Sequence, residues 1–262
     1  MLKSSSARGL PWICVIALAT LVRASETQPN TNSWLKYEEP RALSGTIYPL
    51  GSDRKQPLYQ FNRQVTRQGD RLDVIREFTY PDGKLAVREK AVYQGDALIS
   101  WTLEELQTGT RGTATLDRTG NSGRIRFEYY KNSDTNAAPK KRVEELQKNT
   151  LACDMVGPFL RDHWESLARG EEIRCRYIVV PRMETIGFTF AKYRDELRKG
   201  QPVLIIKMSP TSPIISALVD PLFFVMERTA KHRVLEYSGR TTPKIKVGSK
   251  WKDLDALSVF SW

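Results

Sequence analysis

Short segments in which apolar and polar residues alternate occur along most of the chain, with turn residues between them. In 124–130 (RIRFEYY), Ile125, Phe127 and Tyr129 fall on one side of an extended chain. A period of two residues is typical of a β-strand with one buried face. The Pro-Asp-Gly sequence at 81–83 separates two such segments and predicts a tight turn between them. Repetition of this arrangement predicts an antiparallel β meander.

Two details of the alternation concern single residues. Arg76 interrupts the apolar face of 71–80 (RLDVIREFTY), where a nonpolar side chain would continue the pattern. In the following strand-like segments, Ile99 is expected to share an inward face with Trp101. Near-continuous apolar runs at 203–206 and 222–226 predict strands that are covered on both faces.

One segment of the second half has the period of a helix. In 157–170 (GPFLRDHWESLARG), Leu160, Trp164 and Leu167 recur at positions i, i+4 and i+7. Pro158 suits the first helical turn, and Gly170 is a typical residue at a helix end. The pattern therefore predicts one amphipathic helix that covers the concave side of the sheet. A second, short helical insert is predicted at 212–221.

The predicted fold is mainly β. We expect a strongly curved antiparallel sheet of roughly ten or more strands, a half-barrel or open barrel, packed around the amphipathic helix. Polar residues and a proline at 131–142 indicate a linker, and the sequence leaves open whether it separates two domains. The predicted organisation is a signal peptide at 1–24, a disordered lead-in at 25–34, an antiparallel β meander at 35–131, a linker at 132–149, and a helix with further antiparallel strands at 150–262.

The N-terminus has the pattern of an export signal. Lys3 and Arg8 precede an apolar run at 10–22, and Val22-Arg23-Ala24 places small residues where a signal peptidase requires them. The run is shorter than the roughly 20 residues of a membrane-spanning helix. We therefore expect a cleaved N-terminal signal peptide and an exported protein, in the periplasm or cell envelope of a bacterium.

The chain carries a formal net charge of +11. Removal of 1–24 takes away three basic residues and no acidic ones, which leaves +8. The charge is scattered, with one dense run at 140–142, and an exported protein seldom meets nucleic acid. We expect no nucleic-acid partner. Solubility alone is the favoured explanation of the charge, and an anionic membrane surface or cell envelope is the electrostatic partner that the alternative explanation implies.

After cleavage, two cysteines remain, Cys153 and Cys175. In an oxidising compartment they are able to form a disulfide that attaches the helix to the following strand. The alternative is that Cys175, on the apolar side of 173–179, is a buried free thiol.

Two segments of the second half carry a resemblance. They are FLRDHWESLARGEEIRCRYIVVPRMETIGF (159–188) and DPLFFVMERTAKHRVLEYSGRT (220–241). Together they resemble a group of uncharacterised exported bacterial proteins whose expected architecture is similar to the half-barrels of the LolA/LolB lipoprotein carriers. The resemblance covers roughly 150–262 and implies an envelope protein with an apolar concave surface. It implies no substrate and no residue roles.

Motifs for enzymatic chemistry are absent from the sequence. It contains no Walker loop, no Gly-x-Ser-x-Gly and no Gly-x-Gly-x-x-Gly. His163 lies between Asp162 and Trp164, but position 167 is Leu where a helical metal site would have a second histidine. We predict no catalytic residue, metal or cofactor. A hydrolase site assembled around His163 or His232 stays open as an alternative.

The leading functional hypothesis is a non-enzymatic envelope protein that binds or shields a lipid or acyl chain in its concave sheet. The alternative to an apolar binding site is a filled core, and a structural or interaction module is a further hypothesis. The sequence specifies no oligomeric state. The candidate lining residues are Phe159, Trp164, Phe188, Phe190 and Phe224.

Overall fold

The computed structural model describes residues 42–119, 122–131, 138–217 and 219–262, all within the unit Thr31–Trp262. The predicted signal peptide at 1–24 and lead-in at 25–34 lie outside the described residues. The strands are β1 (Ala42–Pro49), β2 (Tyr59–Gln68), β3 (Arg71–Thr79), β4 (Leu85–Gln94), β5 (Ala97–Glu105), β6 (Thr110–Thr119), β7 (Ser122–Tyr130), β8 (Lys140–Glu145), β9 (Thr150–Leu151), β10 (Ile173–Val179), β11 (Glu184–Arg198), β12 (Gln201–Pro210), β13 (Leu222–Glu227), β14 (Val234–Val247) and β15 (Lys250–Ser261). The helical segments are η1 (Cys153–Met155), α1 (Val156–Asp162), α2 (Trp164–Arg169), η2 (Val180–Arg182) and α3 (Pro213–Ser216), where η denotes a 3₁₀ turn.

All described strands belong to one 15-stranded sheet, in the order β8-β7-β6-β5-β4-β3-β2-β1-β15-β14-β13-β12-β11-β10-β9. Neighbours in the sheet are also neighbours in sequence, except that β1 pairs with β15. That pairing joins the first meander, β1–β8, to the second, β9–β15. The two halves therefore form one continuous sheet. Every pairing is antiparallel apart from the short parallel contact between β9 and β10. The prediction of a mainly β, antiparallel sheet is confirmed.

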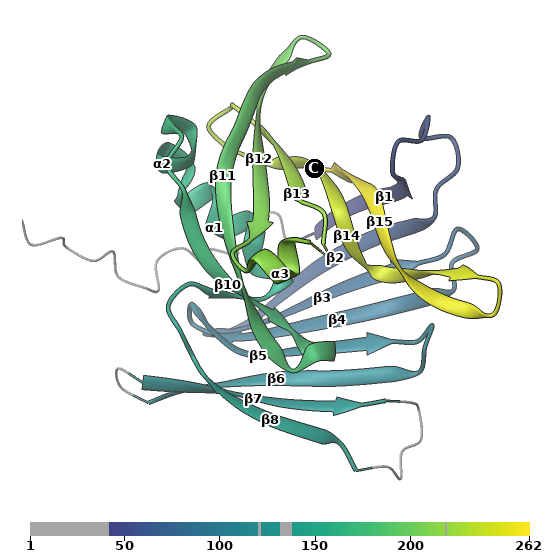
Figure 1. Cartoon of the computed structure of the whole chain (residues 1–262), viewed down its shortest axis with the longest axis vertical. Helices are drawn as coiled ribbons and strands as arrows, with labels where there is room; N and C mark the ends of the chain where they lie inside the picture. Colours follow the sequence, from purple (N-terminus) through teal and green to yellow (C-terminus); the bar gives the residue numbers. More distant parts are fainter. Residues whose placement is uncertain (1–41, 120–121, 132–137, 218) are drawn as a thin grey trace, which may run out of the picture. The chain divides into compact units, whose positions relative to one another are not determined.

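The sheet bends strongly, so that β10–β13 cross over the direction of β3–β8 (Figure 1). The turn η2 at the end of the β10–β11 hairpin contacts β6 and β7 on the concave side. Gly112 in β6 makes this approach feasible, because a Cβ built there would lie 2.5 Å from Val180 Cγ1 and 2.9 Å from the backbone oxygen of Glu128. A residue without a side chain is therefore required where the hairpin tip meets the sheet.

The helical region differs in part from the prediction. In place of one helix over 157–170, α1 ends and α2 begins at His163, whose backbone has φ −99° and ψ 17°. Leu160, Trp164 and Leu167 are buried as predicted. Gly170 ends α2 in the left-handed conformation, with φ 92°, as its position indicated. The short insert predicted at 212–221 contains α3.

The sheet also departs from the predicted pattern in two places. Lys140–Glu145, within the predicted linker at 132–149, forms strand β8 and pairs with β7. Residues 132–137 of the predicted linker lie outside the described residues. Between β4 and β5, Tyr93 pairs with Leu98 and Val92 with Ser100, so Ile99 is skipped by a bulge. Ile99 is therefore exposed and Leu98 is buried in its place.

The burial of β12 follows the prediction from its continuous apolar run. Leu204 and Ile206 belong to the main core, whereas Val203 and Ile205 form a smaller cluster with Val225 on the opposite face. This strand is covered on both sides, as expected for a run of consecutive apolar residues.

We predict that Gly112→Ala lowers the free energy of unfolding by about 1–3 kcal/mol, because the added methyl group overlaps Val180 and the Glu128 carbonyl. Urea denaturation measures the change. Gly157→Ala is the matched control, because a methyl group added there meets no atom within 4 Å and the residue is in a helix. Gly157→Ala is expected to leave stability unchanged or slightly increased. Equal effects of the two substitutions would contradict the close packing at η2.

Candidate functional site

The concave side of the sheet contains a cavity of about 500 Å³ between the first strands and the second half of the chain. This volume is in the range of small-molecule binding sites. Strands β2 to β5 contribute one wall, β11 to β15 contribute the other, and η1, α1 and the β10–β11 hairpin close the space between them. Large apolar side chains from both walls line it, including Phe61, Phe78, Trp101, Phe188, Met208 and Phe224.

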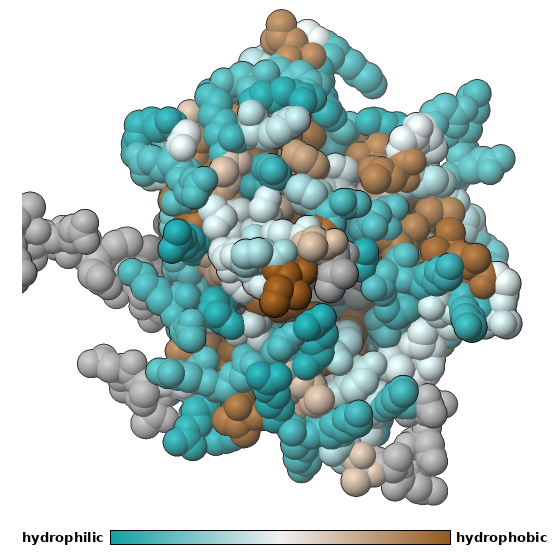
Figure 2. Space-filling model, viewed as in Figure 1, coloured by the Kyte–Doolittle hydropathy of each residue, from teal (hydrophilic) through white to brown (hydrophobic). Residues whose placement is uncertain are grey.

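The segment between β12 and β13 covers part of the cavity. Ile215 and Val219 line the interior, whereas Ile214 on the same short helix is 77% exposed. Apolar atoms are visible over α3 in the middle of a largely hydrophilic face (Figure 2). The cavity therefore lies directly beneath a short apolar segment at the surface.

A buried ion pair projects into the cavity from the first half of the sheet. Arg76 Nη1 in β3 lies 2.8 Å from Glu89 Oε2 in β4, and the two side chains are 12% and 3% exposed. The guanidinium carbon also lies 5.3 Å, 5.9 Å and 6.0 Å from the ring centroids of Phe61, Phe78 and Trp101. Stacking on aromatic rings compensates part of the cost of burying the charge.

The contact between Arg76 and Glu89 is electrostatic and lacks the alignment of a hydrogen bond. Among the described residues, neither Arg76 Nη1 nor Glu89 Oε2 has a hydrogen-bond partner. The other carboxylate oxygen, Glu89 Oε1, accepts a hydrogen bond of 2.6 Å from the Thr242 hydroxyl in β14. The cavity thus contains a buried donor and a buried acceptor whose hydrogen-bonding capacity is not used by these contacts.

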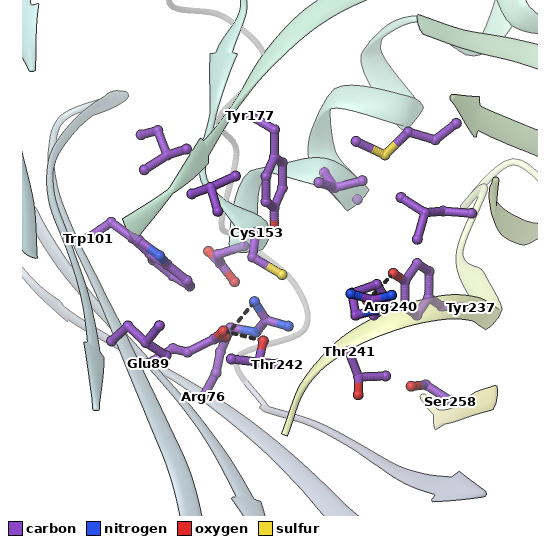
Figure 3. Close-up of a pocket in the computed structure, with 18 of the residues that line it drawn as sticks. Arg76, Glu89, Trp101, Cys153, Tyr177, Tyr237, Arg240, Thr241, Thr242 and Ser258 are labelled. Atoms are coloured by element: carbon purple, nitrogen blue, oxygen red, sulfur yellow. Dashed lines mark hydrogen bonds and ion pairs between the residues drawn. The ribbon is translucent and has the colours of Figure 1, made fainter. Parts of the chain in front are cut away.

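Cys153 and Tyr177 extend this polar cluster on the side of η1 and β10. Tyr177 and Arg76 both act to lower the pKa of the Cys153 thiol, and the three side chains lie close together in Figure 3. Burial raises the pKa of Cys153 above its ordinary value and the pKa of Tyr177 well above its own. Both groups are therefore protonated at neutral pH, and Cys153 is not a thiolate nucleophile.

Burial likewise raises the pKa of Glu89, while the neighbouring Arg76 guanidinium and the Thr242 hydroxyl oppose this shift. The Arg76 guanidinium and the Thr242 hydroxyl therefore favour the ionised form of this carboxyl group against the cost of its burial.

A second buried ion pair positions η1. Arg63 Nε in β2 donates to Asp154 Oδ1 at 2.6 Å, and the Tyr93 hydroxyl in β4 donates to Asp154 Oδ2 at 3.2 Å. Asp154 is thereby attached to two strands of the first meander. Because Cys153 is the preceding residue, this contact places its thiol beside Arg76.

Polar groups of β14 form the opposite side of the cavity. Arg240 pairs with Asp255 at 3.0 Å and with Asp253 at 2.8 Å, and the Tyr237 hydroxyl donates to the Arg240 carbonyl. Further along β14, the Lys244 N–H donates to Gln107 Oε1 at 2.8 Å. The Gln107 side chain therefore ties the backbone of β14 to the first half of the sheet.

The ion pairs described above place charges of both signs along the cavity lining. Such a lining suits a ligand that combines apolar surface with hydrogen-bonding groups.

The five aromatic residues predicted to line a binding surface separate into two groups. Phe188 and Phe224 line the cavity. Phe159 and Phe190 lie behind the lining in the packed core, with their ring centroids 5.7 Å apart, and Phe190 lies 6.0 Å from Phe224. Trp164 does not line the cavity. Its ring stacks on that of His232, with the ring centroids 3.9 Å apart.

The two cysteines are free in the structure, so the predicted disulfide between Cys153 and Cys175 is not formed there. The reason lies in their environments. Cys153 lies near Arg76 and Tyr177, whereas Cys175 is buried in β10 opposite Phe188 of β11.

The histidines do not contribute to the cavity lining. His163 Nδ1 lies 3.0 Å from the Phe159 carbonyl oxygen, and His232 stacks on Trp164. Within the described ranges, no group of three or more His, Cys, Asp or Glu side chains has the arrangement of a metal site. The same residues include no helix with the length and apolar character needed to cross a membrane.

Sequence reasoning did not identify Arg76, Glu89 or Thr242 as site residues. The alternation of apolar and polar residues did mark two of them, Arg76 and Glu89. Arg76 and Glu89 each occupy an inward position of an alternating strand, where the neighbouring inward residues are apolar. A charged residue at such a position indicates a buried partner or a ligand.

No protein-family model matches the chain, and no curated protein matches it. Among solved structures, a DUF1329 family protein from Desulfovibrio piger is similar over 86% of this chain and 85% of its own, with 9% identity and a TM-score of 0.24. A porin-like protein from Bacteroides uniformis is similar over 84% of this chain and 95% of its own, with 8% identity and a TM-score of 0.18. At these TM-scores neither similarity bears on function. Neither structure is a LolA or LolB carrier, so that resemblance stays a prediction.

We predict that Asp154→Asn destabilises the protein by about 3–5 kcal/mol, because it removes the carboxylate charge that pairs with the buried Arg63 guanidinium. Chemical denaturation measures the loss. Glu77→Gln is the control, since it removes one carboxylate from an exposed pair with Arg88 and is expected to cost less than about 1 kcal/mol. Similar costs for the two variants would show that the Arg63–Asp154 pair does not support η1.

A second prediction concerns thiol reactivity. Burial raises the pKa of Cys175 to about 12 and also raises that of Cys153. Alkylation at pH 8 is therefore expected to leave both residues unmodified in the folded protein and to modify both in denaturant. Peptide mass spectrometry measures each site separately. Recovery of a peptide pair linked through Cys153 and Cys175 would contradict the structure.

Proposed function

We propose that this protein is a non-enzymatic, exported cell-envelope protein that binds an amphiphile, such as a lipid or a free acyl chain, inside its curved sheet. The observation that carries the proposal is the cavity of about 500 Å³ in which apolar walls surround a small cluster of buried polar groups. A packed core would fill this space with side chains at close to crystalline density. Here the walls remain apart, although the residues on them are large.

The apolar walls provide the binding energy for a hydrocarbon chain. Phe61 and Phe78 come from the first meander, and Phe188 and Phe224 face them from the second. Each methylene group removed from water between such walls contributes roughly 0.8 kcal/mol. A chain of several methylenes is therefore sufficient to bind without a strong polar contact.

The polar cluster provides a position for the other end of the ligand. Arg76 Nη1 is a donor and Glu89 Oε2 an acceptor, and neither has an aligned partner among the described residues. A ligand group that both donates and accepts, such as a hydroxyl or a protonated acid, matches this pair. In the proposal, the cluster orients the amphiphile and the walls hold its chain.

The cellular location in this proposal derives from the sequence. The N-terminal segment has the pattern of an export signal, and the remaining chain is basic. A positive protein is attracted to an anionic membrane surface, where lipids and acyl chains are found. Exchange of the ligand with such a surface is consistent with an apolar segment directly above the cavity.

The proposal predicts that the purified protein binds cis-parinaric acid, a fluorescent fatty acid, and that Val234→Trp weakens this binding about tenfold or more. Val234 lines the cavity, so an indole ring there occupies the space of the ligand. Fluorescence titration measures the affinity. Ile99→Trp is the matched control, because Ile99 is an exposed β-strand residue that is not part of the lining.

The control also defines the result that would overturn the proposal. Binding that is equally strong in both tryptophan variants would place the fatty acid elsewhere on the protein. Absence of binding by the folded wild-type protein would reject an acyl-chain site in this cavity.

A further inference from the structure

Strand β8 is the terminal strand of the sheet on the side of the first meander. It pairs with β7 along one edge, and no other described strand pairs with its second edge (Figure 1). Exposed strand edges present unpaired backbone N–H and C=O groups, and proteins usually protect them. The sequence of β8, Lys-Lys-Arg-Val-Glu-Glu, carries charges of both signs in two separate blocks.

The backbone of β8 shows which residues face outward along the open edge. Just beyond β8, the Leu146 N–H donates to the Gly123 carbonyl at the end of β7. Since alternate residues of a strand direct their N–H and C=O groups to opposite edges, Glu144 and Arg142 also direct theirs to β7. Lys141, Val143 and Glu145 therefore direct their backbone groups outward.

The charges of β8 are arranged symmetrically about Val143, with opposite sign on the two sides. Lys141 and Arg142 precede it, and Glu144 and Glu145 follow it. In an antiparallel pair of two identical strands related by a two-fold axis, each residue faces its counterpart at the same distance from the centre. A centre at Val143 places Lys141 opposite Glu145 and Arg142 opposite Glu144.

Other symmetric registers lack this complementarity. A centre at Arg142 places the two arginines opposite each other and Lys141 opposite Val143. A centre at Glu144 places the two glutamates opposite each other. Like charges directly across a strand pair are destabilising, whereas opposite charges stabilise it. The sequence of β8 therefore favours the register centred on Val143.

On one face of this strand the side chains are exposed, whereas on the other face Glu144 pairs with Arg142 and accepts hydrogen bonds from Thr185 within the chain. Val143 is 57% exposed. The Lys141 side chain is 66% exposed and forms a surface ion pair of 3.1 Å with Glu128 on the neighbouring strand. Such an exposed pair contributes little and does not prevent a new partner from approaching.

We propose that β8 is a self-association edge, at which a second copy of this chain adds its own β8 antiparallel, centred on Val143. The outward residues Lys141, Val143 and Glu145 then form backbone hydrogen bonds with the second copy, and the two Val143 side chains meet at the axis. The partner is a second copy because the charge pattern is complementary to itself. This inference does not depend on the ligand-binding proposal.

Charge reversal tests the register. Analytical ultracentrifugation of the purified protein is expected to show a monomer–dimer equilibrium. Lys141→Glu places two acidic residues opposite each other at both ends of the interface and is expected to weaken the dimer about tenfold or more. The double variant Lys141→Glu with Glu145→Lys restores opposite charges and is expected to recover the wild-type dissociation constant.

The double variant also separates self-association from local effects. It retains the repulsion between residue 141 and Glu128 within one chain, so recovery of the dimer is not explained by a repaired fold. Lys252→Glu is the control for net charge, because Lys252 is an exposed strand residue on β15, distant from β8 in the order of the sheet. It is expected to leave the dissociation constant unchanged.

Cross-linking tests the position of the axis. Residues opposite each other in a hydrogen-bonded antiparallel pair have Cα atoms about 5.5 Å apart, a separation that a disulfide spans. Val143→Cys is therefore expected to form a covalent dimer on oxidation. Val247→Cys, also an exposed valine on a strand, is expected to remain monomeric under the same conditions.

Three results would overturn the inference. One is a wild-type protein that stays monomeric throughout the accessible concentration range. The second is a dimer that Lys141→Glu leaves intact. The third is a dimer that the double variant does not restore, which would assign the edge to another register or the interface to another surface.

Discussion

The ion pair between Arg76 and Glu89 is the constraint on which the interior depends. Two charges inside a protein are costly unless each has partners with good geometry. Arg76 and Glu89 come from adjacent strands of the first meander, but the hydroxyl that completes the carboxylate's contacts belongs to Thr242, 153 positions further along the chain than Glu89. The two halves of the sheet must therefore approach each other at this point. The pairing of β1 with β15 provides the connection between distant parts of the chain that makes the approach feasible.

The same polar cluster explains why the space inside the sheet stays open. Apolar side chains alone would pack together, since close packing maximises their contacts. Charged groups that retain unused hydrogen-bonding capacity oppose complete closure, because the apolar walls offer them no partner. The interior thus combines two properties that a filled core does not have together, a volume suited to a small molecule and polar groups directed into that volume. An amphiphile satisfies both, which is the physical basis of the proposed function.

Much of the fold could be predicted from local patterns, and the exceptions have physical reasons. Alternation and turn residues predicted the antiparallel sheet, and Gly170 marked the end of the helical region. The identity of β8 as a strand was missed because its single apolar residue gives no alternation, and only its pairing with β7 reveals it. Of the residues predicted to bind a ligand, Phe188 and Phe224 line the cavity, and the polar cluster was not identified. Arg76 was visible as an interruption of an apolar face, yet no local pattern specifies that its surroundings include groups from the other half of the chain.

The central claim is that the cavity holds a ligand, and native mass spectrometry of the protein isolated from its host without detergent tests it most directly. We expect a population whose mass exceeds that of the chain by the mass of one amphiphile, and collisional activation should release that amphiphile for identification. The additional mass should disappear in Val234→Trp and persist in Ile99→Trp. A wild-type protein with the mass of the chain alone, and an organic extract free of lipids and acyl chains, would contradict a ligand-binding role for the cavity.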